Sequence, residues 1–355
     1  MDTAINYITP HSAFRLNGEY FSFEAIKSLA YSFVKEGNEN EQHLGQFILN
    51  WTDNTSQIYL QTSGTTSKPT TISISKQSFI NSANATGIFF NLKPNDSALC
   101  CLPFAYIAAK MMFVRAWILG LNLDYIEPTS NPLESISIDY DFSAMVPLQL
   151  KNSLTKINQI KTLLVGGAPV SERFKNELIG CQSSIYETFG MTETVSHIAV
   201  KNLSLGDTIF KTLPGISLGV NNNNCLTIKA PKLTPEVLNT KDVVELISKY
   251  EFIWKGRLDH VINSGGLKIF PEELEQQLEP QIKNRFFVAS LPDEHLGQKV
   301  ILVVEGTPQD LNLKWDEIDS KKRPKQIFFI PQFLETKSGK IKRKTTLGQL
   351  DLDHS

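Results

Sequence analysis

Ten residues of the chain combine the side chains that can surround a phosphate. The stretch QTSGTTSKPT runs from Gln61 to Thr70, follows the apolar run QIYL, and holds hydroxyl side chains, a glycine and a lysine. Backbone N–H groups and hydroxyl donors around a glycine can enclose a phosphate without steric conflict. The stretch lacks the Gly-Lys-Ser/Thr ending of a Walker loop. Taken alone, it is therefore more typical of a solvated surface loop than of a nucleotide site.

Two later segments carry residues with related chemistry. The apolar run KTLLV is followed by GGAP, whose small residues let the backbone approach a flat ring. The run SSIY is followed by ETFGMTE, in which Glu193 after Thr192 offers a carboxylate of the kind that Mg²⁺ binds together with substrate phosphates. Ligands of an open parallel sheet bind beyond the carboxyl ends of its strands. If QIYL, KTLLV and SSIY are neighbouring strands, their tails converge on one crevice, and together they favour a nucleotide site.

The first half of the chain alternates between short apolar runs and helical patterns. SALCCLPF joins KTLLVGG and SSIYETFG as a buried strand. Apolar residues at helical spacing predict helices over 76–90, 106–119 and 171–179, with Ser75 and Ser171 placed as N-caps. This alternation predicts an α/β fold, with a layered large domain built on a mostly parallel sheet.

The pattern changes twice after this region. Residues 198–244 are rich in Gly, Pro and Asn and hold short alternating segments such as CLTIKA, which predicts a small antiparallel β region. Farther on, a helical pattern over 271–278 and the apolar runs FFVASL and KVILVVEG predict a small α+β domain. We therefore expect a large N-terminal domain over 1–255 and a small C-terminal domain over 256–355.

The composition limits the kinds of protein that this chain can be. With 355 residues, of which 41% are hydrophobic and 20% charged, it can bury a core and is not disordered. A formal net charge of −2 disfavours nucleic acid as a partner, since duplex-binding proteins carry a basic surplus. The N-terminus shows no secretory signal, and Lys110 and Arg115 interrupt the most apolar stretch, AYIAAKMMFVRAWILGLNL. We therefore expect no membrane span.

The four cysteines show neither metal-ligand nor CxxC spacing. They fit small core residues in a reduced, cytoplasmic protein. The oligomeric state is left open by the sequence, with a homodimer as one option.

Four motifs in a fixed order carry a resemblance to a known family. QTSGTTSKPT, YETFGMTE, WKGRLDHVINSGGLKIFPEELE and ETKSGKIKR resemble the motif series of the adenylate-forming superfamily, which includes acyl-CoA synthetases, peptide-synthetase adenylation domains and firefly luciferase. The resemblance covers residues 57–344. It implies an enzyme that joins ATP and a carboxylic acid to form an acyl-adenylate, with Mg²⁺, and then passes the acyl group to coenzyme A. It also implies that family's fold, a large N-terminal domain followed by a small mobile one.

The resemblance implies nucleotide-binding roles for residues in three segments. The grip on the β- and γ-phosphates is assigned to Thr62, Ser63, Gly64, Thr65 and Thr66. The adenine site is assigned to Gly167, Ala168, Pro169, Phe189 and Gly190, with the Phe189 ring stacked on the base. Thr192 would contact the α-phosphate, and Glu193 would bind Mg²⁺. The first segment departs from the family, which carries a glycine where Ser67 stands and a lysine where Thr70 stands.

Further roles follow from motifs nearer the C-terminus. Asp242 and Arg257 would hold the ribose, although Asp242 could instead be a helix cap or a solvated carboxylate. Asp259 would be the hinge of the C-terminal domain, and Gly265 and Gly266 would line the path of pantetheine.

The last motif supplies a catalytic cation. Lys340 would bridge the substrate carboxylate and the α-phosphate, where a preorganised ammonium offsets the repulsion between two anions. The alternative is a lysine of a solvated basic tail, because KSGKIKRK holds several cations.

The combination of FGMTETVSHIA with a short chain looks most like the short o-succinylbenzoate–CoA ligases of menaquinone biosynthesis. That resemblance implies a small aromatic carboxylic acid with a second carboxylate as the substrate. Alternative functions are a ligase for benzoate or another small acid, and a catalytically inactive nucleotide-binding relative.

Residues for the acid are expected in two places. Tyr106 and Ile107 stand where relatives carry a gating aromatic residue, and Lys110 and Arg115 follow in the same predicted helix. A cation among buried apolar residues needs an anionic partner, which a ligand carboxylate could supply. Alternatively, Lys110 snorkels to the surface and Arg115 pairs with an acidic residue. In addition, Ser196 and His197 could face the carboxylate or the aromatic ring.

Overall fold

The computed structural model of this chain describes residues 9–62, 70–335 and 341–350, and its largest element is a twelve-stranded sheet. Half of the sheet is parallel, with the strand order β1 (Arg15–Leu16), β5 (Asn122–Tyr125), β4 (Ser97–Cys100), β6 (Tyr140–Met145), β7 (Ile160–Val165) and β8 (Ser184–Gly190). The predicted α/β class is confirmed, and so are the three strands expected from SALCC, KTLLV and SSIY.

The predicted antiparallel region continues the same sheet and is not a separate unit. From β8 the sheet runs on through β9 (His197–Asn202), β10 (Phe210–Thr212), β14 (Glu251–Arg257), β13 (Leu238–Ser248), β12 (Cys225–Lys229) and β11 (Ser217–Val220), each pair antiparallel. The change of direction occurs at the β8–β9 pair, where the ETFGMTE segment lies.

The prediction that QIYL belongs to the parallel sheet is wrong. β2 (Gln57–Thr62) pairs antiparallel with β3 (Thr70–Ser75) in a separate two-stranded sheet. Ile58 and Ile74 are paired and buried, whereas Tyr59 on the other face is exposed. One buried and one solvated face are typical of an antiparallel hairpin, because parallel strands are covered on both faces.

The expected helices are present, with their predicted caps. They are α3 (Lys76–Phe90), α4 (Ile107–Leu119) and α6 (Glu172–Leu178), joined by α1 (Phe23–Glu36), α2 (Glu39–Thr52) and α5 (Pro147–Asn152). The hydroxyl groups of Ser75 and Ser171 accept hydrogen bonds from backbone N–H groups of the first turns of α3 and α6. α4 ends at Gly120, whose positive φ of 76° is the left-handed conformation that stops a helix.

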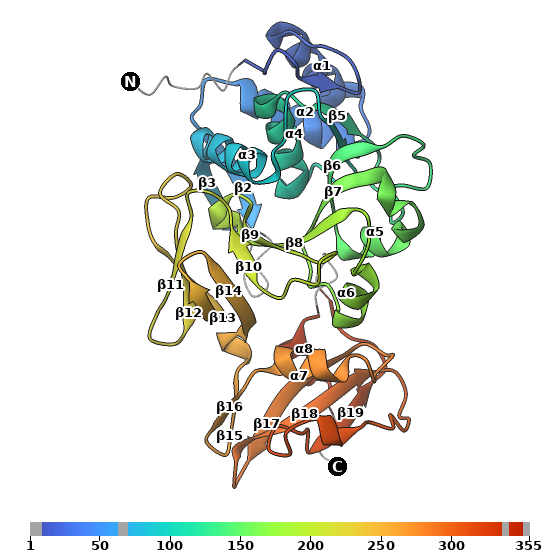
Figure 1. The fold of residues 1–355 in the computed structure, drawn as a ribbon, viewed down its shortest axis with the longest axis vertical. Helices are drawn as coiled ribbons and strands as arrows, with labels where there is room; N and C mark the ends of the chain where they lie inside the picture. Colours follow the sequence, from blue (N-terminus) through green and yellow to red (C-terminus); the bar gives the residue numbers. More distant parts are fainter. Residues whose placement is uncertain (1–8, 63–69, 336–340, 351–355) are drawn as a thin grey trace.

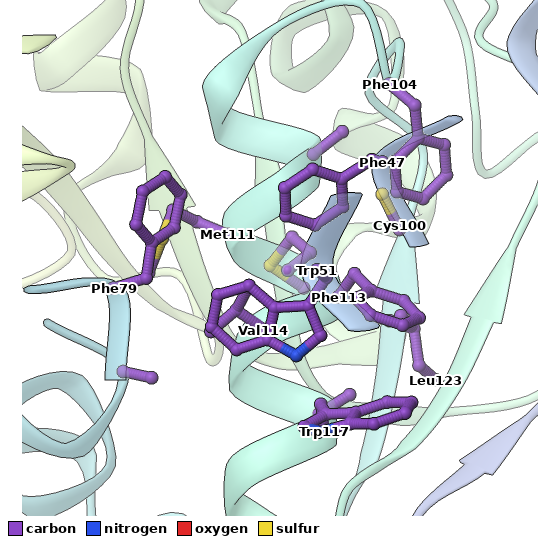
Figure 2. Packing of buried hydrophobic residues seen from close by; sticks show 14 of the residues in the cluster. Phe47, Trp51, Phe79, Cys100, Phe104, Met111, Phe113, Val114, Trp117 and Leu123 are labelled. Carbon is purple, nitrogen blue, oxygen red and sulfur yellow. The ribbon is translucent and has the colours of Figure 1, made fainter. Parts of the chain in front are cut away.

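Helices cover both faces of the parallel half of the sheet. Ala98 and Cys100 of β4 point into a core shared with α1 to α4, and Leu99 points into a second core shared with α5 and α6. This alternation follows from the two-residue repeat of a strand. Figure 2 shows the first core around α4, where the rings of Phe47 and Phe113 pack edge to face at 5.9 Å.

A second sheet of five strands follows β14 and has its own cores. Its elements are β15 (Ile262–Ser264), β16 (Leu267–Ile269), α7 (Pro271–Leu278), β17 (Phe286–Asp293), β18 (Gly297–Glu305), β19 (Gln326–Ile330) and α8 (Arg343–Leu347). A 3₁₀ turn over Leu258–His260 connects it to β14, and Figure 1 shows α7 facing α6. Among the helices of the described residues, none is both long and apolar enough to cross a membrane.

Candidate active site

The GGAP loop and the end of β8 lie side by side. β7 and β8 are parallel neighbours, with Val165 paired to Glu187. Thr188 donates a hydrogen bond of 3.0 Å to the carbonyl of Val165, and a Cβ on Gly166 would lie 2.3 Å from the Thr188 hydroxyl oxygen. Gly167 adopts a positive φ of 83°, which side chains rarely allow. Two of the three strand tails expected to converge therefore do so, and Gly167, Ala168 and Pro169 lie next to β8.

Phe189 holds a fixed position on the sheet next to this loop. Its ring is partly buried and packs against Phe252 at 5.1 Å and Phe210 at 5.9 Å. Those contacts immobilise the ring without burying it completely. A rigid, partly exposed aromatic ring is suited to stack on a flat base.

The turn after β8 is tightly held. A Cβ on Gly190 would lie 2.5 Å from the carbonyl oxygen of Ser196 and 2.6 Å from the Cα of His197. Only glycine at position 190 therefore allows the start of β9 to lie so close to the end of β8. Thr194 is buried, and its hydroxyl oxygen accepts a hydrogen bond of 3.1 Å from the backbone N–H of Met191. This fixes the 3₁₀ turn Thr192–Thr194, in which Thr192 is partly buried.

Backbone strain follows directly after this turn. Val195 has φ 67° and ψ −52°, and the N–H of Ser196 donates to the carbonyl of Thr194 at 2.7 Å. This is a γ-turn with a positive φ, a costly conformation for a β-branched residue. Such strain persists only where its surroundings enforce it, and it is common at ligand-binding sites.

Glu193, the residue expected to bind a metal, is exposed in the same turn. Across the part of the chain that the structure describes, no three His, Cys, Asp or Glu residues come together as a metal-binding group. A single exposed carboxylate is compatible with Mg²⁺, which binds through one or two carboxylates plus substrate phosphates.

Arg115 lies in a buried polar cluster between α4, α3 and β9. Only 3% of the residue is exposed. Its Nη2 donates to the Ser196 hydroxyl at 3.2 Å and approaches His197 Nδ1 at 3.4 Å, and its Nε approaches the Thr86 hydroxyl at 3.4 Å. The guanidinium also lies 6.0 Å from the centre of the Phe142 ring. The predicted substrate residues Arg115, Ser196 and His197 are therefore brought together.

The charge of Arg115 has no acidic partner among the described residues, so the alternative of a pairing with Asp or Glu is not observed there. Burial lowers the pKa of Arg115 to about 10. Burial and the nearby guanidinium together hold the pKa of His197 well below its usual value, so this imidazole is neutral at pH 7. The cluster thus carries one positive charge without an anion.

Asp242 and Arg257 face each other at the end of the antiparallel half. They are register partners in β13 and β14, and an Arg257 nitrogen lies 3.6 Å from an Asp242 oxygen. Trp254 Nε1 donates to Asp242 at 3.0 Å, and Arg257 Nε donates to Asp259 at 3.2 Å. Because Asp242 lies within a strand, it does not cap a helix. The expected ribose residues and the expected hinge residue therefore form one chain of ion pairs.

Comparison with known proteins shows the family to which this chain belongs. The family model described as AMP-binding enzyme matches residues 34–224, more than half of the chain. The chain belongs to the AMP-binding enzyme family. An AMP-forming acyl-CoA synthetase/AMP-acid ligase II-like protein from Dyadobacter fermentans is 34% identical and superimposes with a TM-score of 0.61, over 91% of this chain and 97% of its own.

Two further relatives share less sequence with this AMP-binding enzyme. A 2-succinylbenzoate–CoA ligase from Listeria monocytogenes is 26% identical over 357 residues, covering 89% of this chain and 74% of the relative. The o-succinylbenzoate coenzyme A synthetase from Bacillus subtilis, in complex with its acyl-adenylate intermediate, is 22% identical with a TM-score of 0.70, over 81% of this chain and 68% of its own. It has the same fold.

In this AMP-binding enzyme, the other residues expected to bind the acid lie around α4. Tyr106 precedes the helix and is 52% exposed, with Ile107 beginning the helix beside it. Lys110 is half-buried, and its ammonium donates to the Ala105 carbonyl at 3.4 Å and lies 5.9 Å from the Phe47 ring centre. Burial lowers the pKa of Lys110. At 100° per residue, Lys110 and Arg115 project from different faces of α4, and Lys110 does not share the Arg115 cluster.

Gly265 and Gly266 form the tight turn between β15 and β16. Both have positive φ, 55° and 82°, as the two central residues of a short hairpin turn require. Of the phosphate loop, the structure describes the backbone of Thr62 at the end of β2, whereas Ser63, Gly64, Thr65 and Thr66 lie outside the described residues. Lys340 also lies outside them.

Two residues of the Arg115 cluster were not expected from the sequence. Ser82 and Thr86 lie on the buried face of α3, and the Ser82 hydroxyl is 3.1 Å from that of Ser196. They are four residues apart on the helix face that also carries Phe79 and Ala83. Two hydroxyl residues at this spacing on an otherwise apolar face are the signal that could have identified them.

Proposed function

We propose that this chain is an AMP-forming acid–thiol ligase that activates o-succinylbenzoate with ATP and transfers the acyl group to coenzyme A, in menaquinone biosynthesis. The names of the Listeria and Bacillus relatives support the choice of acid. The buried Arg115, whose charge lacks an acidic partner among the described residues, carries the proposal.

A buried guanidinium is stable only if its charge is offset. Removing an unpaired charge from water is costly, so such groups are normally paired. In this cluster the neighbours of Arg115 are neutral hydroxyls, a neutral imidazole, the Met112 sulfur and the Phe142 ring. A substrate with one carboxylate for activation and a second for Arg115 supplies the missing anion. Benzoate and other monocarboxylic acids do not.

The motif resemblance supports roles for the surrounding residues. Gly167, Ala168, Pro169 and Phe189 bind adenine, Asp242 and Arg257 bind the ribose, and Thr192 binds the α-phosphate. Glu193 holds Mg²⁺, which offsets negative charge on the phosphates. Lys340 stabilises the charge that develops between the carboxylate and phosphorus.

The second half-reaction calls for a rearrangement of the chain. We place a mobile C-terminal domain at residues 256–355, a hinge at Asp259, and the path of the coenzyme A thiol beside Gly265 and Gly266. Such a motion aligns the thiol on the acyl-adenylate after ATP has reacted. ATP and coenzyme A as co-substrates are consistent with a cytoplasmic enzyme.

Substitution of Arg115 tests this proposal. Arg115→Lys keeps the charge but loses the planar fork that binds a carboxylate in two places. We expect kcat/KM for o-succinylbenzoate to fall about 10²-fold, as for the loss of a buried charged hydrogen bond, with monocarboxylic acids little changed. Lys110→Ala is the matched control, since it removes a cation from the other face of the same helix. If Lys110→Ala abolished the preference for the diacid and Arg115→Lys did not, the assignment of Arg115 would be wrong.

A further inference from the structure

His197 carries a buried ring nitrogen that has no hydrogen-bond partner among the described residues. The residue is 8% exposed, and its Nε2 makes no hydrogen bond to any described residue. A buried polar nitrogen without a partner is destabilising. An acceptor atom supplied by a ligand would remove that cost.

The neighbours of His197 determine where its single proton lies. A guanidinium only donates hydrogen bonds, so Nδ1, 3.4 Å from Arg115 Nη2, must be the acceptor. The Ser196 hydroxyl, also 3.4 Å from Nδ1, can donate to the same nitrogen. A neutral imidazole carries one N–H, and this arrangement puts it on Nε2. The partnerless atom is thus a hydrogen-bond donor.

The Nε2–H donor of His197 is uncharged, and its position on the ring limits the kind of acceptor atom that it can bind. Nδ1 and Nε2 lie on opposite sides of the imidazole, so the acceptor at Nε2 is a different atom from an anion held at Arg115. The aromatic ring of Phe90 lies 6.5 Å from that of His197. A neutral donor in apolar surroundings cannot offset the desolvation of a second anion. An uncharged oxygen, such as that of a ketone, suits it.

The backbone fixes His197 close to the proposed reaction centre. It is paired with Gly190 across β8 and β9, and a Cβ on Gly190 would lie 2.6 Å from its Cα. Gly190 leads directly into the turn that holds Thr192 and Glu193. A substrate whose carboxylate is activated at this turn therefore passes His197 on its way to Arg115.

We infer that His197 is a specificity-determining residue that donates from Nε2–H to an uncharged carbonyl oxygen of the acid, separate from the carboxylate bound by Arg115. This inference rests on the proposed function. It narrows the substrate class to dicarboxylic acids that carry a ketone between the activated carboxylate and the distal one.

A panel of three acids and two variants tests this inference. The acids are o-succinylbenzoate, its analogue with CH₂ in place of the ketone, and its analogue without the ring carboxylate. We expect His197→Leu to lower kcat/KM about 10–100-fold for both ketone acids, mainly through KM, and less than about 3-fold for the CH₂ analogue. His197→Gln, which keeps an N–H donor, should recover most of the loss. Equal losses for all three acids would overturn the inference.

A measurement without substrate separates this inference from the proposed function. Nitrogen-15 NMR of protein labelled at its six histidines, with the His197 signals identified from His197→Gln, reports the tautomer directly. We expect a neutral ring with the proton on Nε2 throughout pH 6–8; a proton on Nδ1 would overturn the inference whatever the substrate. Failure of wild-type protein to act on any acid of the panel would contradict the proposed function instead.

Discussion

At the scale of single residues, two buried side chains of this site each carry a group whose complementary partner is absent from the described residues. Arg115 has a charge without an acidic partner among the described residues, and His197 has an N–H without an acceptor. Both groups are buried, and an unpaired polar group costs more in a buried site than in water. A ketone-containing diacid, as proposed above, would supply a partner for each of them.

Gly190 is the residue at which a single methyl group should disrupt this site. In Gly190→Ala the new Cβ would meet the backbone of Ser196 and His197, which cannot move aside as a flexible side chain could. We expect a loss of stability of about 1–3 kcal/mol and at least a 10-fold loss of acid-dependent activity. Gly219→Ala is the control, because its new Cβ would meet the hydroxyl oxygen of Thr227 in β12. Equal effects of both substitutions on activity would show that the β8–β9 contact has no special role.

At the scale of elements, the parallel strands and the three helices were predictable because their patterns are local. Ser75 and Ser171 mark helix starts by side-chain chemistry alone. The pairing of β2 with β3 was not predicted, since an apolar run such as QIYL does not reveal its partner. Thr86 was missed for a related reason: its contact with Arg115 joins α3 to α4 through tertiary packing. The sequence thus pointed to the charged residue Arg115, but not to the hydroxyl residues of α3 that contact its cluster.

A buried lysine joins the end of α2 to the start of α3. Lys76 is fully buried and donates to an Asp53 carboxylate oxygen at 2.8 Å. Burial acts to raise the pKa of Asp53, but the hydrogen bonds from Lys76 and Thr55 outweigh it and lower the pKa below 3.8. When folding lowers the pKa of a carboxyl group, its ionised form stabilises the folded state at pH values above the unfolded-state pKa. This stabilisation is lost as the pH falls through the folded-state pKa.

Because the Asp53 side chain is 42% exposed and solvent screens its charge, we expect Asp53→Asn to reduce the free energy of unfolding by only about 0.5–1 kcal/mol at pH 7. The difference from wild type should shrink as pH falls below about 4, where the wild-type carboxyl takes up its proton. Urea unfolding of both proteins between pH 3 and pH 7 measures this. A difference that stayed constant over the range would mean that the Asp53 charge does not stabilise the junction.

At the scale of the whole molecule, a few polar contacts link the five-stranded sheet unit to the rest of the chain. The Glu279 carboxylate, at the end of α7, accepts hydrogen bonds from the backbone N–H groups of Glu172 and Arg173 at the start of α6. Lys255 in β14 lies 3.4 Å from Glu273 of α7. α6 follows the GGAP loop, so the proposed C-terminal domain touches the chain just beyond the proposed adenine site.

Removal of the Glu279 side chain should weaken the contact between α7 and α6 without unfolding the five-stranded sheet unit or the rest of the chain. A side chain that caps a helix contributes about 0.5–2 kcal/mol of stability. In Glu279→Ala we therefore expect the equilibrium constant between domain orientations to change about 2- to 30-fold. The ratio of the adenylation rate to the thioester-forming rate, measured separately, should change accordingly. Glu294→Ala removes an exposed carboxylate from the same unit and is the control. An unchanged ratio together with unchanged small-angle scattering would contradict a role for Glu279 in domain orientation.

In the proposed function, this chain activates an acid with two carboxylates. Acid-dependent exchange of labelled pyrophosphate into ATP tests it most directly, because the exchange requires only the first half-reaction. We predict exchange with o-succinylbenzoate and Mg²⁺, little exchange with benzoate, and a coenzyme A thioester once the thiol is added. Exchange that is equally fast with monocarboxylic acids, or absent with o-succinylbenzoate, would contradict the account.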